Sequence, residues 1–222
     1  MSTWSEADIP DQTGRVALVT GANSGLGFET ARALAQHGAH VVMGCRNPDR
    51  AADAEARINE TSPSGSIEVL LVDMADLDSI AAGAERFLVD HGRLDLLVNN
   101  AGIMATPKGA TAQGFEQQFG VNHLGHFALT APLLPALLAA DGSRVVNVSS
   151  NAHKFGRMNF DDLMGERDYN PWRAYGQSKL ANLLFTRELQ RRLAAAGVDT
   201  IAVAAHPGAS KTELGKESGG IL

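Results

Sequence analysis

Short apolar runs alternate with segments of helical periodicity along the whole chain, and this alternation constrains the fold more than any other feature. The runs are rich in β-branched residues and apolar almost throughout, as in strands that are buried on both faces of a parallel sheet. They cover residues 15–20, 39–45, 67–73, 94–100, 144–150 and 200–206, and helical patterns lie between them at about 27–37, 48–60, 76–90, 113–139 and 175–196. The pattern predicts a doubly wound α/β fold with right-handed crossovers, in which ligands bind at the carboxyl ends of the strands.

The bulk properties indicate a single soluble domain. With 222 residues the chain has room for one hydrophobic core, so we expect an N-terminal arm over residues 1–13 and one domain over residues 14–222. Its formal net charge of −6 argues against nucleic acid and anionic membranes as partners. The start is polar and acidic, no apolar run is long enough to span a bilayer, and Cys45 is the single cysteine. These features predict a cytoplasmic protein.

The first predicted strand ends in the glycine-rich stretch TGANSGLG, residues 20–27. In it, Gly21 would permit the tight turn, Gly25 the close approach of the backbone to a phosphate, and Gly27 close packing of the helix. The helix would offer its free N–H groups and the positive end of its dipole to a pyrophosphate. Glycine-rich turns also occur without nucleotides, but this one follows a first strand and opens a helix. The position predicts a Rossmann-type dinucleotide site formed by Gly21, Asn23, Ser24, Gly25, Leu26 and Gly27.

Residues at the ends of the second and third strands indicate which dinucleotide binds. An acidic residue at the second strand end binds the ribose 2′-hydroxyl of NAD, whereas an arginine accommodates the 2′-phosphate of NADP. Here Cys45 is followed by Arg46, whose guanidinium can fork onto a phosphate. We therefore expect NADP (NADPH) in preference to NAD, the alternative being a solvated surface arginine. Asp73 and Met74 are placed to meet the adenine, although Asp73 can instead cap the next helix.

Tyr175 and Lys179 stand four positions apart in a predicted helix and would lie one turn apart on the same face. A free phenol, with a pKa of about 10, is a poor acid–base catalyst near neutrality. A neighbouring ammonium group would lower the pKa of Tyr175 and make it useful for general acid–base catalysis. The alternative is a buried phenol beside a surface lysine.

Six motifs follow one another along the chain: TGANSGLG, NNAG (99–102), VNHLGHF (121–127), VNVSS (146–150), YGQSK (175–179) and HPG (206–208). With them the chain resembles the short-chain dehydrogenase/reductases from about residue 14 to 214. The stretches CRN, NHLGHF and SSNAH are similar to the retinol-dehydrogenase-like branch. The resemblance implies a single-domain Rossmann-type enzyme with a catalytic tetrad of Asn122, Ser150, Tyr175 and Lys179.

The implied roles of the tetrad follow the chemistry of its side chains. Tyr175 would exchange a proton with the substrate oxygen, while Lys179 would lower the pKa of Tyr175 and bond the nicotinamide ribose. Ser150 would donate a hydrogen bond to the substrate oxygen, with Ser149 as its rival for this role. Asn122 would hold a water against Lys179 and complete a proton relay.

The resemblance also implies supporting contacts to the cofactor, and no metal site is expected. His123 and His126 flank the tetrad asparagine, but no other ligand pattern converges on them. Six further positions would hold the cofactor, three after the fourth strand and three after the sixth: Asn100, Ala101, Gly102, Pro207, Gly208 and Thr212.

Two segments depart from what is common in the family. The connection between the tetrad serine and tyrosine, residues 151–174, is longer than in many members and would form a wall of the substrate cleft. Four of its residues would line an apolar pocket or anchor the loop: Phe155, Met158, Phe160 and Trp172. The chain stops at KTELGKESGGIL, so the C-terminal strand and lid of the family would be lacking and the sixth strand would be an exposed edge.

These features predict an NADP-dependent oxidoreductase that interconverts an alcohol and an aldehyde or ketone on a small lipophilic substrate. Similar members also reduce carbon–carbon double bonds, and the sequence does not separate the two. The alternative is a catalytically silent NADP-binding or redox-sensing module, which the intact tetrad disfavours and the short C-terminus favours. The glycine spacing disfavours a nucleotide-sugar epimerase. By resemblance, a homodimer or homotetramer would form through the helices near 113–139 and 175–196.

Overall fold

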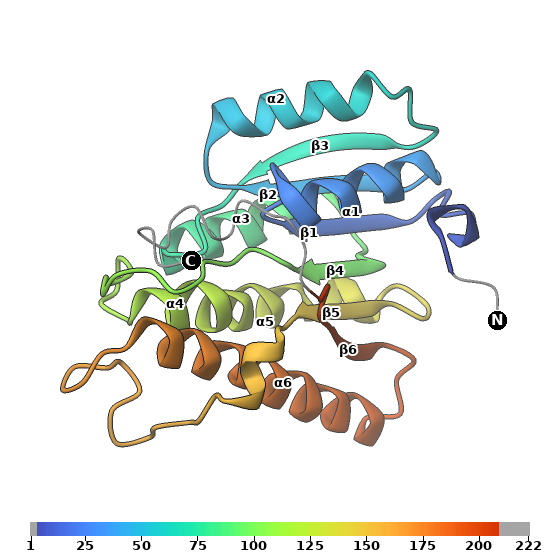
Figure 1. Cartoon of the computed structure of the whole chain (residues 1–222). Coiled ribbons are helices and arrows are strands. Elements are labelled where there is room, and N and C mark those ends of the chain that lie inside the picture. The colour runs from blue at the N-terminus through green and yellow to red at the C-terminus, as the bar shows by residue number, and fades with distance from the viewer. Residues whose placement is uncertain (1–3, 209–222) are drawn as a thin grey trace.

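Six parallel strands form the sheet of the computed structural model, which describes residues 4–208 (Figure 1). The strands are β1 (Val16–Thr20), β2 (His40–Cys45), β3 (Ser66–Leu71), β4 (Leu96–Asn99), β5 (Arg144–Val148) and β6 (Ile201–Ala205). Their order is β3-β2-β1-β4-β5-β6, so the chain starts in the middle of the sheet and changes direction between β1 and β4. The doubly wound α/β sheet is confirmed, and the strand ends lie within two residues of the predicted ones.

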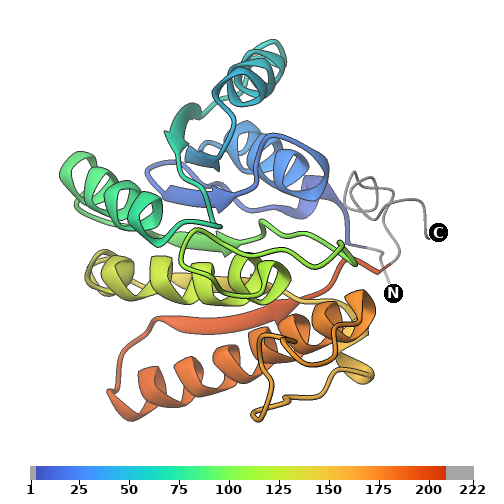
Figure 2. The same ribbon diagram turned by 90° about the vertical axis from the view of Figure 1, so that its left-hand side faces the viewer.

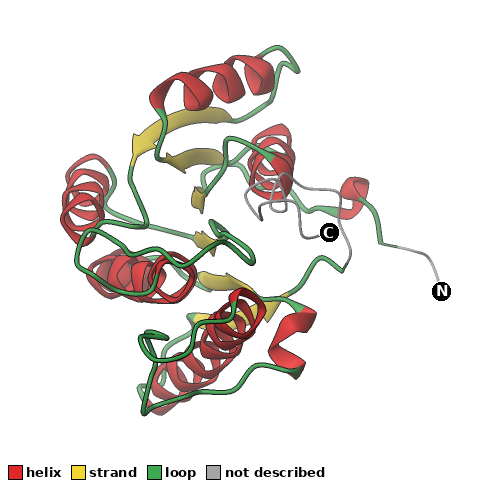
Figure 3. Cartoon of the chain, turned by 60° about the vertical axis from the view of Figure 1, so that its left-hand side comes forward, coloured by secondary structure: helices red, strands yellow, loops and turns green. Residues whose placement is uncertain are grey.

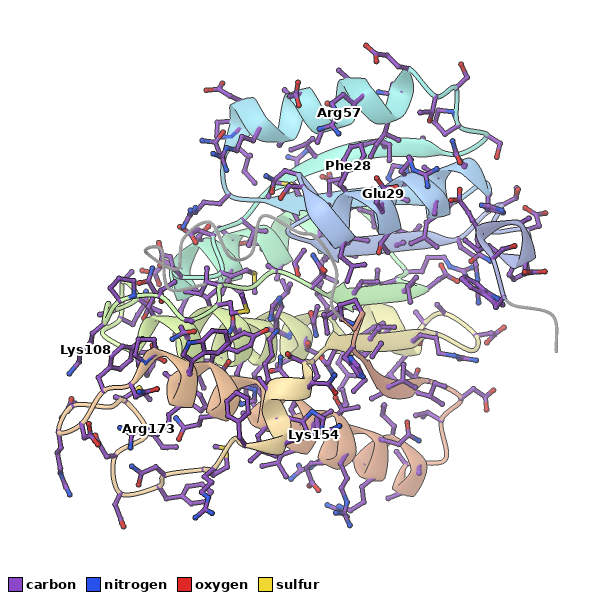
Figure 4. The ribbon with its side chains drawn as sticks, in the orientation of Figure 1. Phe28, Glu29, Arg57, Lys108, Lys154 and Arg173 are labelled. Carbon is purple, nitrogen blue, oxygen red and sulfur yellow. The ribbon has the colours of Figure 1, made fainter. Side chains whose placement is uncertain are left out.

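Helices cover both faces of the sheet (Figures 2 and 3). On one face α1 (Gly25–Gln36) and α2 (Pro48–Asn59) bury a core that includes Val19, Met43 and Ile58. Arg57 of α2 lies over the ring of Phe28 of α1, 4.3 Å from its centroid (Figure 4). On the other face α3 (Leu77–Asp90), α5 (Gly125–Leu138) and α6 (Pro171–Ala195) cover a second core, which is formed around Leu18, Val42, Phe87, Leu97 and Leu133. The two cores explain why the strands are apolar on both faces.

Side chains and turns set the helix ends. Gly38 follows α1 with a φ of +99°, a left-handed conformation that favours glycine just after a helix. Asn47 caps α2, and Asn170 caps α6 by accepting from the backbone N–H groups of Trp172 and Arg173. The last helix therefore begins four residues before its predicted start at 175, because Asn170 and Pro171 form a start signal that helical periodicity alone does not reveal.

The predicted helix over residues 113–139 is three pieces. The short α4 (Gln117–Phe119) leads into a π-helical turn, η2 (Gly120–Leu124), and only then into α5. The turn lies where the loop after β3 approaches: a methyl group on Gly125 would sit 2.6 Å from the carbonyl oxygen of Met74. Such π-turns are frequent at functional sites, and this one carries Asn122.

Two short 3-10 helices complete the described part of the chain. In η1 (Glu6–Asp8) of the N-terminal arm, Glu6 receives hydrogen bonds of 3.0 and 2.7 Å from Arg32 of α1. The second, η3 (Asn151–Lys154), follows β5 directly. Within residues 4–208, none of the helices combines the length and the apolar character that crossing a membrane requires.

Candidate active site

The four predicted catalytic residues come together at the carboxyl ends of β4 and β5. Tyr175 and Lys179 lie in the first half of α6, with 4% and 3% of their surfaces exposed. The ammonium Nζ of Lys179 lies 5.7 Å from the centroid of the Tyr175 ring and donates a 3.0 Å hydrogen bond to the carbonyl oxygen of Val148, the last residue of β5. The alternative of a surface lysine is therefore wrong, since the ammonium group is buried against the end of a strand.

Burial determines the protonation of this pair. It raises the pKa of Tyr175, and a hydrogen bond with Ser150 opposes the rise. It also lowers the pKa of Lys179 to about 8, which leaves the ammonium group charged at neutral pH. The net shift of the Tyr175 pKa is therefore upward, opposite in direction to the expected one, because desolvation of the phenol outweighs the hydrogen bond of Ser150.

The two neighbouring serines have different environments. The hydroxyl of Ser149 is buried and donates to the carbonyl oxygen of Lys179 at 3.0 Å. Ser150 opens η3, where its Oγ accepts from the N–H of Ala152 at 3.2 Å, and its side chain lies close enough to the Tyr175 phenol to oppose the rise of its pKa. This geometry favours Ser150 over Ser149 as the residue beside the reacting oxygen. Lys154 lies on the same short helix, in front of α6 (Figure 4).

The amide of Asn122 is engaged by protein groups. Its Oδ1 accepts from the N–H of Ile103 at 2.8 Å, and its Nδ2 donates to the carbonyl oxygen of Ile103 and to the hydroxyl of Ser178, both at 2.9 Å. The amide therefore joins the loop after β4 to α6. Gly102 lies between these groups, since a methyl group there would be 3.1 Å from Asn122 Oδ1 and 3.6 Å from Lys179 Nζ.

Sequence reasoning missed a buried network around Thr20 and His126. Burial lowers the pKa of His126 to about 4, so the ring is neutral. Its Nδ1 lies 3.0 Å from the carbonyl oxygen of Asn122, which can only accept, so Nε2 accepts from the Thr20 hydroxyl at 2.9 Å. The Thr20 oxygen in turn accepts from the N–H groups of Asn100 and Ala101 at 2.9 and 3.0 Å. Two sequence features could have indicated this network: Thr20 directly precedes Gly21, and His126 follows Asn122 by four residues.

The glycine loop has the shape of a phosphate cradle. Gly21 has a φ of +66°, and a methyl group on Gly27 would lie 2.3 Å from the Gly21 carbonyl oxygen, so both positions require glycine. At the start of α1, Ser24 makes no side-chain hydrogen bond to the helix, whereas side chains cap α2, α3 and α6. The first N–H groups of α1 are thus left for an anion, which fits a dinucleotide pyrophosphate. Asn23 lies in the turn before α1, and Gly25 and Leu26 are the first two residues of the helix; all three are half-buried.

Arg46 lies just beyond β2 and is exposed. The glycine loop is hydrogen-bonded to this end of β2: the N–H of Gly21 donates to the carbonyl oxygen of Gly44 at 2.7 Å. The structure therefore brings the predicted 2′-phosphate residue to the same edge as the predicted phosphate cradle.

Asp73 and Met74, which were predicted to contact the adenine, differ in their contacts and burial. Asp73 accepts from the N–H of Ala75 at 2.9 Å, while Asp76 caps α3, so the alternative in which Asp73 is the helix cap is wrong. The Met74 side chain is buried against α5 near Gly125.

The remaining predicted residues frame the site from two sides. Asn100 donates to the carbonyl oxygen of Thr20 at 2.8 Å, which joins the ends of β4 and β1. Pro207 and Gly208 follow β6 and are exposed, and Thr212 lies outside the described residues.

The long connection to α6 is held by polar contacts, among them the phenol of Tyr169, which donates to the carbonyl oxygen of Thr106 at 2.9 Å. Lys108 donates to the carbonyl oxygen of Glu166 at 3.4 Å, and Arg173 pairs with Asp168 at 2.7 Å (Figure 4). The aromatic residues predicted to line a pocket or anchor the loop differ: Phe155 and Phe160 are 54% and 77% exposed, while Trp172 packs edge-on against Tyr175 at 6.3 Å. Met158 is partly exposed.

Comparison with known proteins agrees with this geometry. The family model described as short chain dehydrogenase matches residues 15–219. Retinol dehydrogenase 12 from Mus musculus is 48% identical over 205 residues, which cover 92% of this chain and 64% of that protein. The chain thus spans somewhat less than two thirds of the length of the curated relatives it matches.

Two solved structures are similar over most of the chain. An uncharacterized protein from Mycobacterium Paratuberculosis is 50% identical, with a TM-score of 0.85 over 98% of this chain and 76% of that one. A short-chain dehydrogenase from Sphingobium yanoikuyae, in complex with NADPH, is 26% identical, with a TM-score of 0.74 over 92% of this chain and 75% of that one.

Proposed function

The chain belongs to the short-chain dehydrogenase family, and from this premise we propose that it is an NADP-dependent oxidoreductase that interconverts an alcohol and an aldehyde or ketone. The observation that carries the proposal is the buried pair of Tyr175 and Lys179, with the Ser150 side chain beside the phenol at the end of β5. A phenol, an ammonium group and a hydroxyl that converge at the ligand-binding edge of the sheet form a site for polarising a carbonyl and moving one proton.

Each side chain has a separate task in carbonyl reduction. The nicotinamide cofactor supplies the hydride when it is bound. Tyr175 is neutral because burial raises its pKa, so its O–H donates the proton to the substrate oxygen. Ser150 donates a hydrogen bond to the same oxygen as negative charge develops there. The charged Lys179 stabilises the phenolate that is left on Tyr175, which its distance of 5.7 Å from the ring allows.

For the cofactor, we propose the glycine loop as the pyrophosphate site and Arg46 as the 2′-phosphate site. Support comes from the uncapped start of α1, from the exposed position of Arg46 and from the NADPH bound to the Sphingobium relative. The N–H groups of α1 would bind the pyrophosphate, and Arg46 would pair with a phosphate that NAD does not carry.

The proposed substrate is a lipophilic alcohol or carbonyl compound. Its support is the 48% identity to a retinol dehydrogenase and the exposed aromatic rings of Phe155 and Phe160 in the connection beside the site. Exposed rings on a loop that leads to a reacting residue are suited to cover an apolar molecule.

The experiment that tests the proposal measures NADPH consumption with a panel of apolar aldehydes and ketones. We expect turnover that rises with the apolar character of the substrate. NADPH binding without turnover of any member would instead indicate a silent NADP-binding module.

A further inference from the structure

Three potential metal ligands meet at the sheet edge opposite to the proposed catalytic site. His40 is the first residue of β2, Glu68 is the third residue of β3, and His91 follows the last residue of α3. The Nε2 atoms of His40 and His91 each lie 3.2 Å from the same oxygen of Glu68, Oε2. We propose that these three side chains bind one divalent transition-metal ion of the Zn²⁺ class.

The distances between the ligand atoms suit such an ion. Zinc bonds to imidazole nitrogen and carboxylate oxygen are about 2.0–2.2 Å long, and in a tetrahedral site this places neighbouring ligand atoms about 3.4 Å apart. Both nitrogen-to-oxygen distances are 3.2 Å, and all three ligand atoms lie within 4.8 Å of one another. A small ring rotation completes the geometry, and water takes the fourth position.

The lone pairs of the imidazole nitrogens and of the Glu68 carboxylate oxygen face one another, and they repel unless a cation or a proton lies between them. Nε2 of His91 is buried and has no hydrogen-bond partner among the residues that the structure describes, although it faces the Glu68 carboxylate. An imidazole nitrogen that carries no proton is repelled by a carboxylate oxygen unless something positive lies between them. A metal ion bonded to both removes this cost.

Surrounding groups orient the two rings, as expected around a metal site. The Nδ1 atom of His40 lies 2.7 Å from the hydroxyl oxygen of Ser66. When Nε2 binds a metal, Nδ1 carries the proton of the ring, and its N–H can donate a hydrogen bond to this oxygen. The ring of His91 packs against Phe87, with centroids 4.8 Å apart. The neighbouring carboxylate of Asp90 is occupied by Arg86 at 2.6 Å and does not compete.

The position of the cluster, away from the proposed catalytic site, indicates that the ion would have a structural role. It would join the C-terminal end of α3 to the first residues of β2 and β3, which are distant in the chain and lie at the outer part of the sheet (Figure 1). No step of the proposed reaction takes place at this edge, because the tetrad lies at the carboxyl ends of the strands. The ion would therefore stabilise the fold without taking part in turnover.

Metal binding tests the proposal directly. The full chain is stripped with a chelator and titrated with Zn²⁺, and Co²⁺ absorption in the visible range reports the coordination geometry. We expect one equivalent of Zn²⁺ to bind, a tetrahedral Co²⁺ spectrum and a higher melting temperature with zinc. His91→Ala should weaken binding more than about 100-fold, and Ser66→Ala about tenfold, as second-layer partners of metal-bound histidines do.

Two further variants keep the test decisive. Glu68→Gln retains the shape of the side chain and should lose binding even if His91→Ala folds poorly. His37→Ala changes a histidine outside the cluster and should bind zinc like the wild type. Failure of the wild type to take up zinc would overturn the proposal, as would equal uptake by the wild type and Glu68→Gln.

Discussion

At the scale of the residue, the proposed active site is shaped by groups that the fold removes from water. Tyr175 and Lys179 are nearly inaccessible, and burial favours the neutral form of each. A neutral phenol suits proton donation to a substrate, while a lysine whose pKa is about 8 keeps its charge at neutral pH and gives it up at moderately alkaline pH. The same burial that prepares the chemistry therefore makes the site costly to fold.

Substitution of Tyr175, Ser150 and Ser149 separates their roles in turnover. Tyr175→Phe should lower kcat by about 10²–10⁴-fold while NADPH still binds, since it removes only the proton donor. Ser150→Ala should lower kcat by a similar amount, because the hydroxyl beside Tyr175 that would stabilise the developing charge on the substrate oxygen is lost. Steady-state kinetics with an apolar aldehyde provide the measurement. A larger loss for Ser149→Ala than for Ser150→Ala would reverse the assignment.

The second prediction concerns the stability cost of Lys179. Its pKa is lowered from 10.5 to about 8 in the fold, which corresponds to about 3 kcal/mol. Between these two values the unfolded chain binds more protons than the folded chain, so wild-type stability should rise with pH across this window. Lys179→Met should be more stable than the wild type at pH 7 by up to about 3 kcal/mol, with the gap closing toward pH 10.5.

Urea unfolding of both proteins between pH 7 and pH 10.5 measures this gap. An equal dependence on pH in the two proteins would show that Lys179 is not the group that titrates.

At the scale of the element, what a helix or strand contacts determines how much of it the sequence reveals. The strands were predictable because each is apolar on two faces, and the tetrad positions followed from motifs that resemble a family. The π-turn at Gly120–Leu124 was not predictable from periodicity, since Asn122 reaches Ile103, 19 positions away. The cluster of His40, Glu68 and His91 was missed for the same reason, because three separate elements contribute one ligand each.

The third prediction tests the packing of α1 against the glycine loop. A methyl group on Gly27 would lie 2.3 Å from the Gly21 carbonyl oxygen and 2.4 Å from Asn100 Nδ2. Gly27→Ala should therefore displace the start of α1 and weaken NADPH binding by at least about tenfold, or about 1.4 kcal/mol. Gly92→Ala is the matched control, because a methyl group there meets nothing within 4 Å. Equal NADPH affinity in the two variants, measured by titration, would remove the glycine loop from the binding site.

At the scale of the whole molecule, an exposed apolar face on α5 and α6 is suited to the predicted association of two copies of the chain. Phe127 and Leu138 of α5 are 54% and 46% exposed, and Leu184 of α6 is 46% exposed. Phe127 contacts Phe185 edge-on, with ring centroids 5.5 Å apart, so the two helices present a joint apolar surface. We propose that this surface forms a homodimer contact.

The fourth prediction follows from this surface. Sedimentation should give a dimer or a larger even assembly for the wild type, and Phe127→Glu should shift it toward monomer because a charge at an apolar contact is costly. Val89→Glu introduces the same charge on α3, at a residue that is 74% exposed, and should leave the assembly unchanged. A monomeric wild type would contradict the proposed contact.

Calorimetric titration of the chain with NADPH and with NADH tests most directly whether the fold binds NADP and selects it through Arg46. We predict that NADPH binds more tightly than NADH to the wild type, and that Arg46→Asp inverts this order, because a carboxylate repels the 2′-phosphate and can accept from the 2′-hydroxyl. No binding of either cofactor, or the same ratio of affinities in the wild type and Arg46→Asp, would contradict the account.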